Sequence, residues 1–155
     1  MVSLPYESAT AGEKALSDIC KTLQAFGCAG FGTYTDEERG LIRVQFRWRN
    51  RDISLEANWK GYAVAWQKAH PYKYTMKGSR ADYDQRALRQ ARISVCSVLR
   101  DWVKGQVTAI ECGIMSFEVA FMPHMLLPSG ERVIDRVQIS LLPPPEETKV
   151  VEFKP

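Results

Sequence analysis

The stretch that decides the fold is residues 41–59, which read LIRVQFRWRNRDISLEANW. Apolar and polar side chains alternate on both sides of Asn50 and Arg51, as they do in two β-strands that bury one face. Folding the two runs about Asn50 and Arg51 sets apolar side chains opposite apolar ones and predicts an antiparallel hairpin. Arg51 is not the glycine preferred at the second position of such a turn, so the turn type stays open. The predicted pairs are Trp48 with Ile53, Phe46 with Leu55, Val44 with Ala57 and Ile42 with Trp59.

A helix and a third strand are predicted before the hairpin. Thr10 and Glu13 have the spacing of a capping box, and Gly27 stands where a helix ends. Apolar residues recur at helical spacing between these two signals. A strand around Ala29–Thr35 follows and completes a three-stranded meander.

After the hairpin, residues 61–69 fit either a short helix or a continuing strand. The helix is favoured, with its end at His70, because a residue before proline disfavours the helical conformation. A loop follows over residues 71–78, and Ser79 with Asp82 has the spacing of a second helix cap. A long helix then runs from about Arg80 to at least Lys104, with a kink at Gly105 as an open alternative. Its predicted apolar face consists of Leu88, Ala91, Val95, Val98, Leu99 and Trp102.

The C-terminal third is predicted to hold small elements only. A short helix at residues 116–122 is stopped by Pro123, a turn lies at residues 127–130, and a strand spans Arg132–Leu142. The fold class is therefore α+β, an antiparallel β-meander packed against an N-terminal helix and a long amphipathic helix, with a small C-terminal β element. Residues 1–142 are expected to form one compact domain, and the Pro-rich residues 143–155 a flexible tail.

Composition excludes several classes of protein. The chain has 155 residues, of which 45% are hydrophobic and 25% charged, unlike disordered, collagenous or membrane-embedded chains. It lacks a signal-peptide pattern and any apolar run of the roughly 18 residues that a membrane-spanning helix needs. The four cysteines have spacings that match no zinc or redox motif, so buried reduced thiols in a cytoplasmic protein are expected. They are Cys20, Cys28, Cys96 and Cys112.

The net charge of +3 conceals a strong asymmetry along the chain. Residues 39–104 contain 15 basic and 5 acidic side chains, whereas the other 89 positions contain 6 basic and 13 acidic ones. A local excess of this kind is typical of a segment that meets a polyanion.

Residues suited to catalysis are scarce. His70 and His124 are far apart in sequence, and neither has a nucleophile or metal ligand at a recognisable spacing. Asp52, Glu56 and Lys60 have a spacing like that of a nuclease but lack its second-neighbour lysine. The sequence has no Gly-rich phosphate loop. We therefore predict a protein without enzymatic activity, with no catalytic residue, cofactor or metal site.

Three consecutive basic segments are candidates for contact with phosphates. Arginines follow one strand of the hairpin, aromatic and basic side chains interleave in the loop before the long helix, and a basic face continues along that helix. The backbone N–H groups at the start of the helix also favour an anion, with Lys77, Ser79 and Arg80 able to complete the pocket. Each has a simpler interpretation: Arg49 faces Asp52 with Glu56 nearby, the loop tyrosines pack on the core, and the helix face is merely solvated. The candidate binding residues are Arg43, Arg47, Tyr72, Lys73, Tyr74, Lys77, Ser79, Arg80, Arg86 and Arg89.

Several segments resemble short uncharacterised proteins of bacteriophage and prophage genomes. The similar segments are KGYA at 60–63, RQAR at 89–92, LRDWVKGQVTAIE at 99–111 and SFE at 116–118. This resemblance implies a phage accessory protein that acts on nucleic acid or on host defence systems, and it transfers no residue role. The order helix, meander, helix is also similar to the core of single-strand annealing proteins, at the level of architecture only.

Two functions remain in view at this point. The first is a phage-encoded accessory protein that binds DNA or RNA through the basic strand, loop and helix, without catalysis. The second is a counter-defence protein that binds a host effector or sequesters a nucleotide signal. The expected partners are nucleic acid or a phosphorylated small molecule, with a host protein and a homo-oligomer as open alternatives, and no membrane.

Overall fold

Three antiparallel strands and two long helices form the body of the computed structural model, which describes residues 3–137 and 142–143. The sheet order is β1-β2-β3, so the meander is confirmed and the fold class is α+β. The strands are β1 (Ala29–Asp36), β2 (Leu41–Trp48) and β3 (Arg51–Asn58). The helices are α1 (Gly12–Phe26), α2 (Lys60–Ala69), α3 (Arg80–Glu111), α4 (Phe117–Phe121), the 3₁₀-helix η1 (Met122–His124) and α5 (Val133–Arg136).

The hairpin forms, but its predicted register is wrong by two residues. The turn consists of Arg49 and Asn50, whose φ angles of 48° and 62° are both positive, as a two-residue turn that matches the strand twist requires. Because the side-chain period of a strand is two, this shift leaves every residue on its predicted face. Trp59 lies outside the sheet at the start of α2. The observed pairs include Phe46 with Ile53, Val44 with Leu55 and Ile42 with Ala57.

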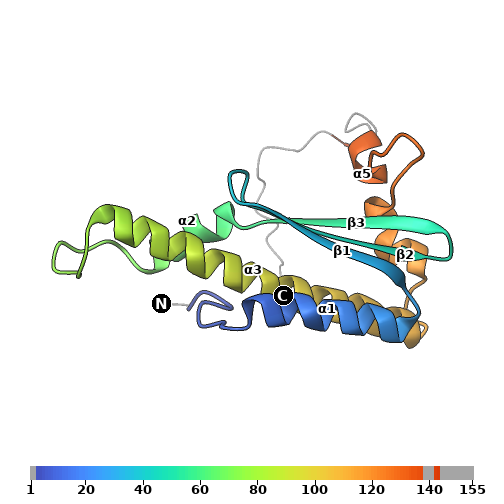
Figure 1. Cartoon of the computed structure of the whole chain (residues 1–155), viewed down its shortest axis with the longest axis horizontal. Coiled ribbons are helices and arrows are strands. Elements are labelled where there is room, and N and C mark those ends of the chain that lie inside the picture. The colour runs from blue at the N-terminus through green and yellow to red at the C-terminus, as the bar shows by residue number, and fades with distance from the viewer. Residues whose placement is uncertain (1–2, 138–141, 144–155) are drawn as a thin grey trace, which may run out of the picture.

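Helices α1 and α3 run side by side beneath the inner face of the sheet (Figure 1). The buried face of α3 is rich in small side chains, including Ala91, Ser94 and Ser97. Small side chains allow close approach of the neighbouring backbone. The predicted apolar face of α3 is therefore partly wrong: Leu88 and Val98 are 36% and 38% exposed. Helix α3 continues through Gly105 to Glu111.

The helix caps agree with the sequence in two cases out of three. Gly27 ends α1 with a φ of 104°, and Ser79 and Asp82 form a reciprocal capping box before α3. The predicted Thr10 cap is wrong, because α1 begins after Ala11 without a side-chain cap. The backbone that enters α1 is held instead by α3, since the amide of Gln90 donates to the Ala9 carbonyl at 3.0 Å. The favoured helical interpretation of residues 61–69 is confirmed by α2.

The predicted strand Arg132–Leu142 is wrong over its described part, where Val133–Arg136 form one helical turn that begins at Arg132. The side chain of Asp135 accepts a hydrogen bond from the Arg132 backbone, which favours this turn over an extended chain. Residues 138–141 and 144–155 lie outside the described part. Within the described residues, the β structure that follows β3 in the chain consists of single bridges, Ile53 with Met125 and Leu126 with Arg132.

All four cysteines are free thiols, as predicted, but not all are buried. Cys28 and Cys96 are buried, Cys20 is partly buried and Cys112 is exposed. Burial raises the pKa of the Cys28 thiol to about 11. Cys112 is the residue at which α3 ends.

Helix α2, the loop at residues 70–79 and the first part of α3 project beyond the end of the sheet (Figure 1). We call residues 60–89 the arm. Helix α2 packs along α3 and Tyr83 is buried between them, where its hydroxyl donates to the His70 carbonyl at 2.6 Å. The arm is thus an ordered extension of the body, built on the same helix α3.

Candidate functional site

The arm carries much of the positive charge of the molecule. Residues 60–89 contain seven basic and two acidic side chains. Both acidic side chains are engaged, Asp82 in the cap of α3 and Asp84 with Arg80 at 3.5 Å. Within the described residues, six of the basic side chains form no ion pair, which leaves the arm with a net positive surface. One of the six, Lys60, donates to the Glu38 carbonyl at 2.6 Å, and the other five form no side-chain hydrogen bond among the described residues. These five are Lys68, Lys73, Lys77, Arg86 and Arg89.

Aromatic rings form a row along the arm. The Trp66 ring lies 4.7 Å from the ring of His70 and 5.8 Å from that of Tyr83, measured between centroids. The Tyr83 ring in turn lies 5.3 Å from that of Tyr72. Because the Tyr83 hydroxyl is bonded to backbone carbonyls, the row is anchored to the interior of the arm.

The row ends at the tip of the arm with an aromatic side chain that is almost wholly in solvent. Tyr74 is 97% exposed, and its ring makes an edge contact with that of Tyr72, with 5.7 Å between ring centroids. The Arg80 guanidinium lies over the rings of Tyr72 and Tyr83, at 5.0 and 5.3 Å from their centroids. Contrary to the simpler interpretation of the loop, its second tyrosine does not pack back on the core.

The start of α3 differs from the open anion site that the sequence suggested. The Ser79 N–H donates to Asp82 Oδ2 at 2.8 Å, and the Asp82 N–H donates to Ser79 Oγ at 3.2 Å. These hydrogen bonds hold the pKa of Asp82 below its ordinary value. The structure therefore places Ser79 in a helix cap, with a carboxylate where a phosphate was expected.

A hollow of about 400 Å³ opens at the base of the arm. Arg86 and Arg89 of α3 line it, and the N-terminal segment contributes Glu7. Glu7 Oε2 lies 2.9 Å from His70 Nε2, a polar contact that joins the N-terminal segment to the end of α2. The lining residues are Glu7, Ser8, Trp66, His70, Arg86, Arg89, Gln90 and Ile93.

The two strand arginines lie apart from the arm, on the outer face of the sheet. Arg47 Nε donates to Asp52 Oδ1 at 2.8 Å, and this bond lowers the pKa of Asp52. Arg43 Nε donates to Glu56 Oε1 at 3.1 Å. Asp52 is thus paired with Arg47 and not with Arg49, which follows from the observed register. Of the candidate residues, the arm brings together Tyr72, Lys73, Tyr74, Lys77, Ser79, Arg80, Arg86 and Arg89, and it excludes Arg43 and Arg47.

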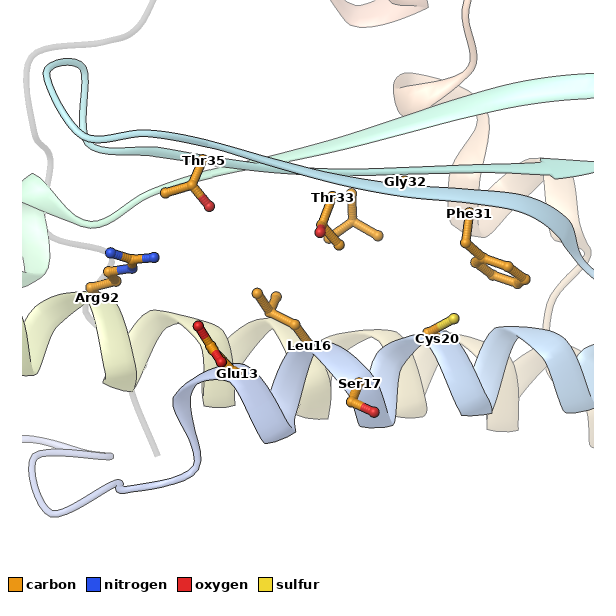
Figure 2. A pocket seen from close by; sticks show the side chains of 10 residues that line it. Glu13, Leu16, Ser17, Cys20, Phe31, Gly32, Thr33, Thr35 and Arg92 are labelled. Carbon is orange, nitrogen blue, oxygen red and sulfur yellow. The ribbon is translucent and has the colours of Figure 1, made fainter.

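A second hollow, of about 500 Å³, separates α1 from β1 and was not anticipated from the sequence (Figure 2). Thr33 and Thr35 face α1 from the edge strand, and their small side chains leave the space between the layers unfilled. Arg92 and Glu13 lie at one end of it (Figure 2). Arg92 is also paired with Glu37 and lies over the Trp59 ring, 5.8 Å from its centroid. No single motif marks the residues that line this hollow, because they come from four separate elements, α1, β1, β2 and α3.

A metal site and a membrane-spanning helix are two further possibilities for residues 3–137 and 142–143. This part of the chain contains no group of three or more His, Cys, Asp or Glu side chains arranged to hold a metal ion. None of its helices combines the length and the apolar character needed to cross a membrane. Charged residues occur along the whole length of the continuous helix α3.

Comparison with known proteins gives no match: no family profile, curated protein or solved structure is significantly similar to this chain.

Proposed function

We propose that this protein binds nucleic acid through its arm. The observation that carries the proposal is the concentration of unpaired basic side chains and an exposed aromatic ring on one projecting element. Phosphates attract lysine and arginine without regard to sequence, and exposed aromatic rings stack on bases of any kind. The arm combines both features, with Tyr74 exposed between Lys73 and Lys77 at its tip.

The proposed contacts divide into two groups by position. Lys73 and Lys77 meet phosphates at the tip, and Arg86 and Arg89 meet them nearer the body. Arg80 is held over Tyr72 and paired with Asp84, so it chiefly orients the tyrosine. No reaction is assigned to the arm, and binding is expected to be weakly dependent on sequence and strongly dependent on salt.

A direct test compares binding of fluorescently labelled single-stranded and duplex oligonucleotides by anisotropy across a salt series. The double variant Lys73→Gln/Lys77→Gln removes two unpaired charges from the arm. Each lost phosphate contact is expected to reduce the slope of log affinity against log salt by about 0.7 to 0.9.

The double variant Arg43→Gln/Arg47→Gln is the matched control, because it removes the same charge from the sheet, where both arginines are ion-paired. It is expected to keep the salt slope of the unmodified protein. Absence of binding at low salt to every oligonucleotide, or an equal change in slope in the two variants, would contradict the proposal.

A further inference from the structure

We infer that the hollow at the base of the arm binds a single nucleotide unit, with its base against Trp66 and its phosphate on Arg86 and Arg89. This inference rests on the proposed function and names the unit that the arm recognises. It concerns a base that is free to leave a duplex stack, either in a single strand or in a free nucleotide.

The aromatic wall of the hollow is held in a fixed position. Trp66 lies between His70 and Tyr83 in the aromatic row and is only partly buried. Tyr83 is itself anchored, because its hydroxyl donates to the His70 and Gln67 carbonyls. A ring that is already ordered loses little conformational freedom when a base stacks on it, which favours binding.

The basic wall of the hollow is available for an anion. Arg86 and Arg89 are both exposed, stand one helical turn apart on α3 and form no ion pair within the described residues. Two guanidinium groups at this spacing can donate to the oxygens of one phosphate. Arg86 and Arg89 therefore form a binding position for one phosphate on α3.

The acidic wall sets the direction of the bound nucleotide. Glu7 lines the same hollow as the α3 arginines and lies at the end of α2, where its Oε2 is 2.9 Å from His70 Nε2. Its carboxylate repels a phosphate, which consequently stays on the α3 side, while the base lies between Trp66 and the N-terminal segment.

The size of the hollow selects an unpaired base. Its volume of about 400 Å³ lies within the range of sites for small ligands and accommodates one base with its sugar and phosphate, but not a duplex. Bases within a duplex are stacked and paired, so they reach such a site only after separation of the strands.

The hollow between α1 and β1 fits this ligand less well. Its one basic side chain, Arg92, is already paired with Glu37, and Glu13 lies beside it (Figure 2). A phosphate there would meet two carboxylates and no unpaired cation.

The experiment uses the complete chain with two probes, the oligonucleotide (dA)₈ and adenosine 5′-monophosphate. Binding is measured by tryptophan fluorescence and by calorimetry, with inorganic phosphate as the control for charge alone. The variants are Trp66→Leu, which removes the ring, and Arg86→Gln/Arg89→Gln, which alters exposed side chains and leaves the packing intact. Each variant is expected to weaken binding of (dA)₈ about fivefold or more, and pairing (dA)₈ with (dT)₈ is expected to weaken it as well.

The outcomes separate the inference from the proposed function. If both variants bind (dA)₈ like the unmodified protein while Lys73→Gln/Lys77→Gln does not, the hollow is not the site and the arm still binds nucleic acid. If the mononucleotide binds and (dA)₈ does not, with binding lost in Arg86→Gln/Arg89→Gln, the hollow takes a free nucleotide and the proposed function is wrong. If neither probe binds, both are wrong.

Discussion

His124 is a half-buried side chain whose buried ring nitrogen is poorly matched to its surroundings. Its Nδ1 atom has no hydrogen-bond partner within the described residues, and its ring lies against Trp102 with 5.5 Å between centroids. Burial lowers the pKa of His124, Arg132 lowers it further, and Glu56 opposes them. The side chain therefore stays neutral in the folded protein at a pH where a free histidine is already charged.

This difference predicts that the protein loses stability as the pH falls below the pKa of a free histidine. Between the ordinary pKa near 6.5 and the lowered folded value, the unfolded chain binds more protons, so the free energy of unfolding decreases. Urea denaturation at about pH 7 and about pH 5 should show a larger decrease for the unmodified protein than for His124→Leu. Asp82 and Asp101 have lowered pKa values and lose their contributions only below about 3.8, outside this window. Equal decreases in the two proteins would refute the assignment to His124.

At the scale of the elements, two glycines with different backbone conformations should respond oppositely to alanine. Gly27 has a φ of 104° and no atom within 4 Å of an added Cβ, so Gly27→Ala costs backbone strain alone, about 1 kcal/mol. Gly105 lies inside α3 with equally open space, and Gly105→Ala should stabilise the helix by about 0.5–1 kcal/mol. Chemical denaturation followed by circular dichroism measures both. A change of the same sign in both variants would show that local packing, and not backbone conformation, decides the effect.

The helices and strands were largely predictable from the sequence, but the register of the hairpin and the buried face of α3 were not. Alternation in residues 41–59 correctly gave both strands and their buried face, but a shift of two residues preserves that face. The register was decided by positive φ angles at Arg49 and Asn50, which the turn preference for glycine did not reveal. In α3, periodicity of large apolar residues missed a buried face that includes Ser94 and Ser97, because neither residue carries an apolar signal.

For the whole molecule, Phe121 is the side chain that ties the C-terminal elements to the body. It is fully buried, and its ring meets Phe46 of β2 at 5.7 Å and Trp102 of α3 at 5.9 Å, measured between centroids. Phe121→Ala should lower the free energy of unfolding by about 3–5 kcal/mol, as truncation of a buried aromatic does. Thermal and urea unfolding would measure the loss. Val119→Ala on the same helix is the control, since Val119 is 66% exposed, and a comparable loss there would contradict this role.

The candidate site was predictable in composition but not in shape. The basic excess in residues 39–104 predicted a charged region, yet it could not show that Arg43 and Arg47 lie on the sheet, paired with Glu56 and Asp52, and not on the arm. The hollow depends on Glu7, which is 63 positions from its partner His70 in sequence. No local pattern records a contact over that separation, because it follows from the packing of the N-terminal segment on α3.

Because α3 runs without a break from the arm into the hydrophobic core, a change in the tilt of α3 within the core moves the tip of the arm. The part of α3 that belongs to the arm, residues 80–89, is about 15 Å long, so a tilt of about 5° at the core displaces the tip by about 1 Å. Such a displacement is comparable to the tolerance of a hydrogen bond. Substitutions in the core that merely reorient α3 are therefore able to misalign the tip with a bound strand while every residue of the arm is unchanged.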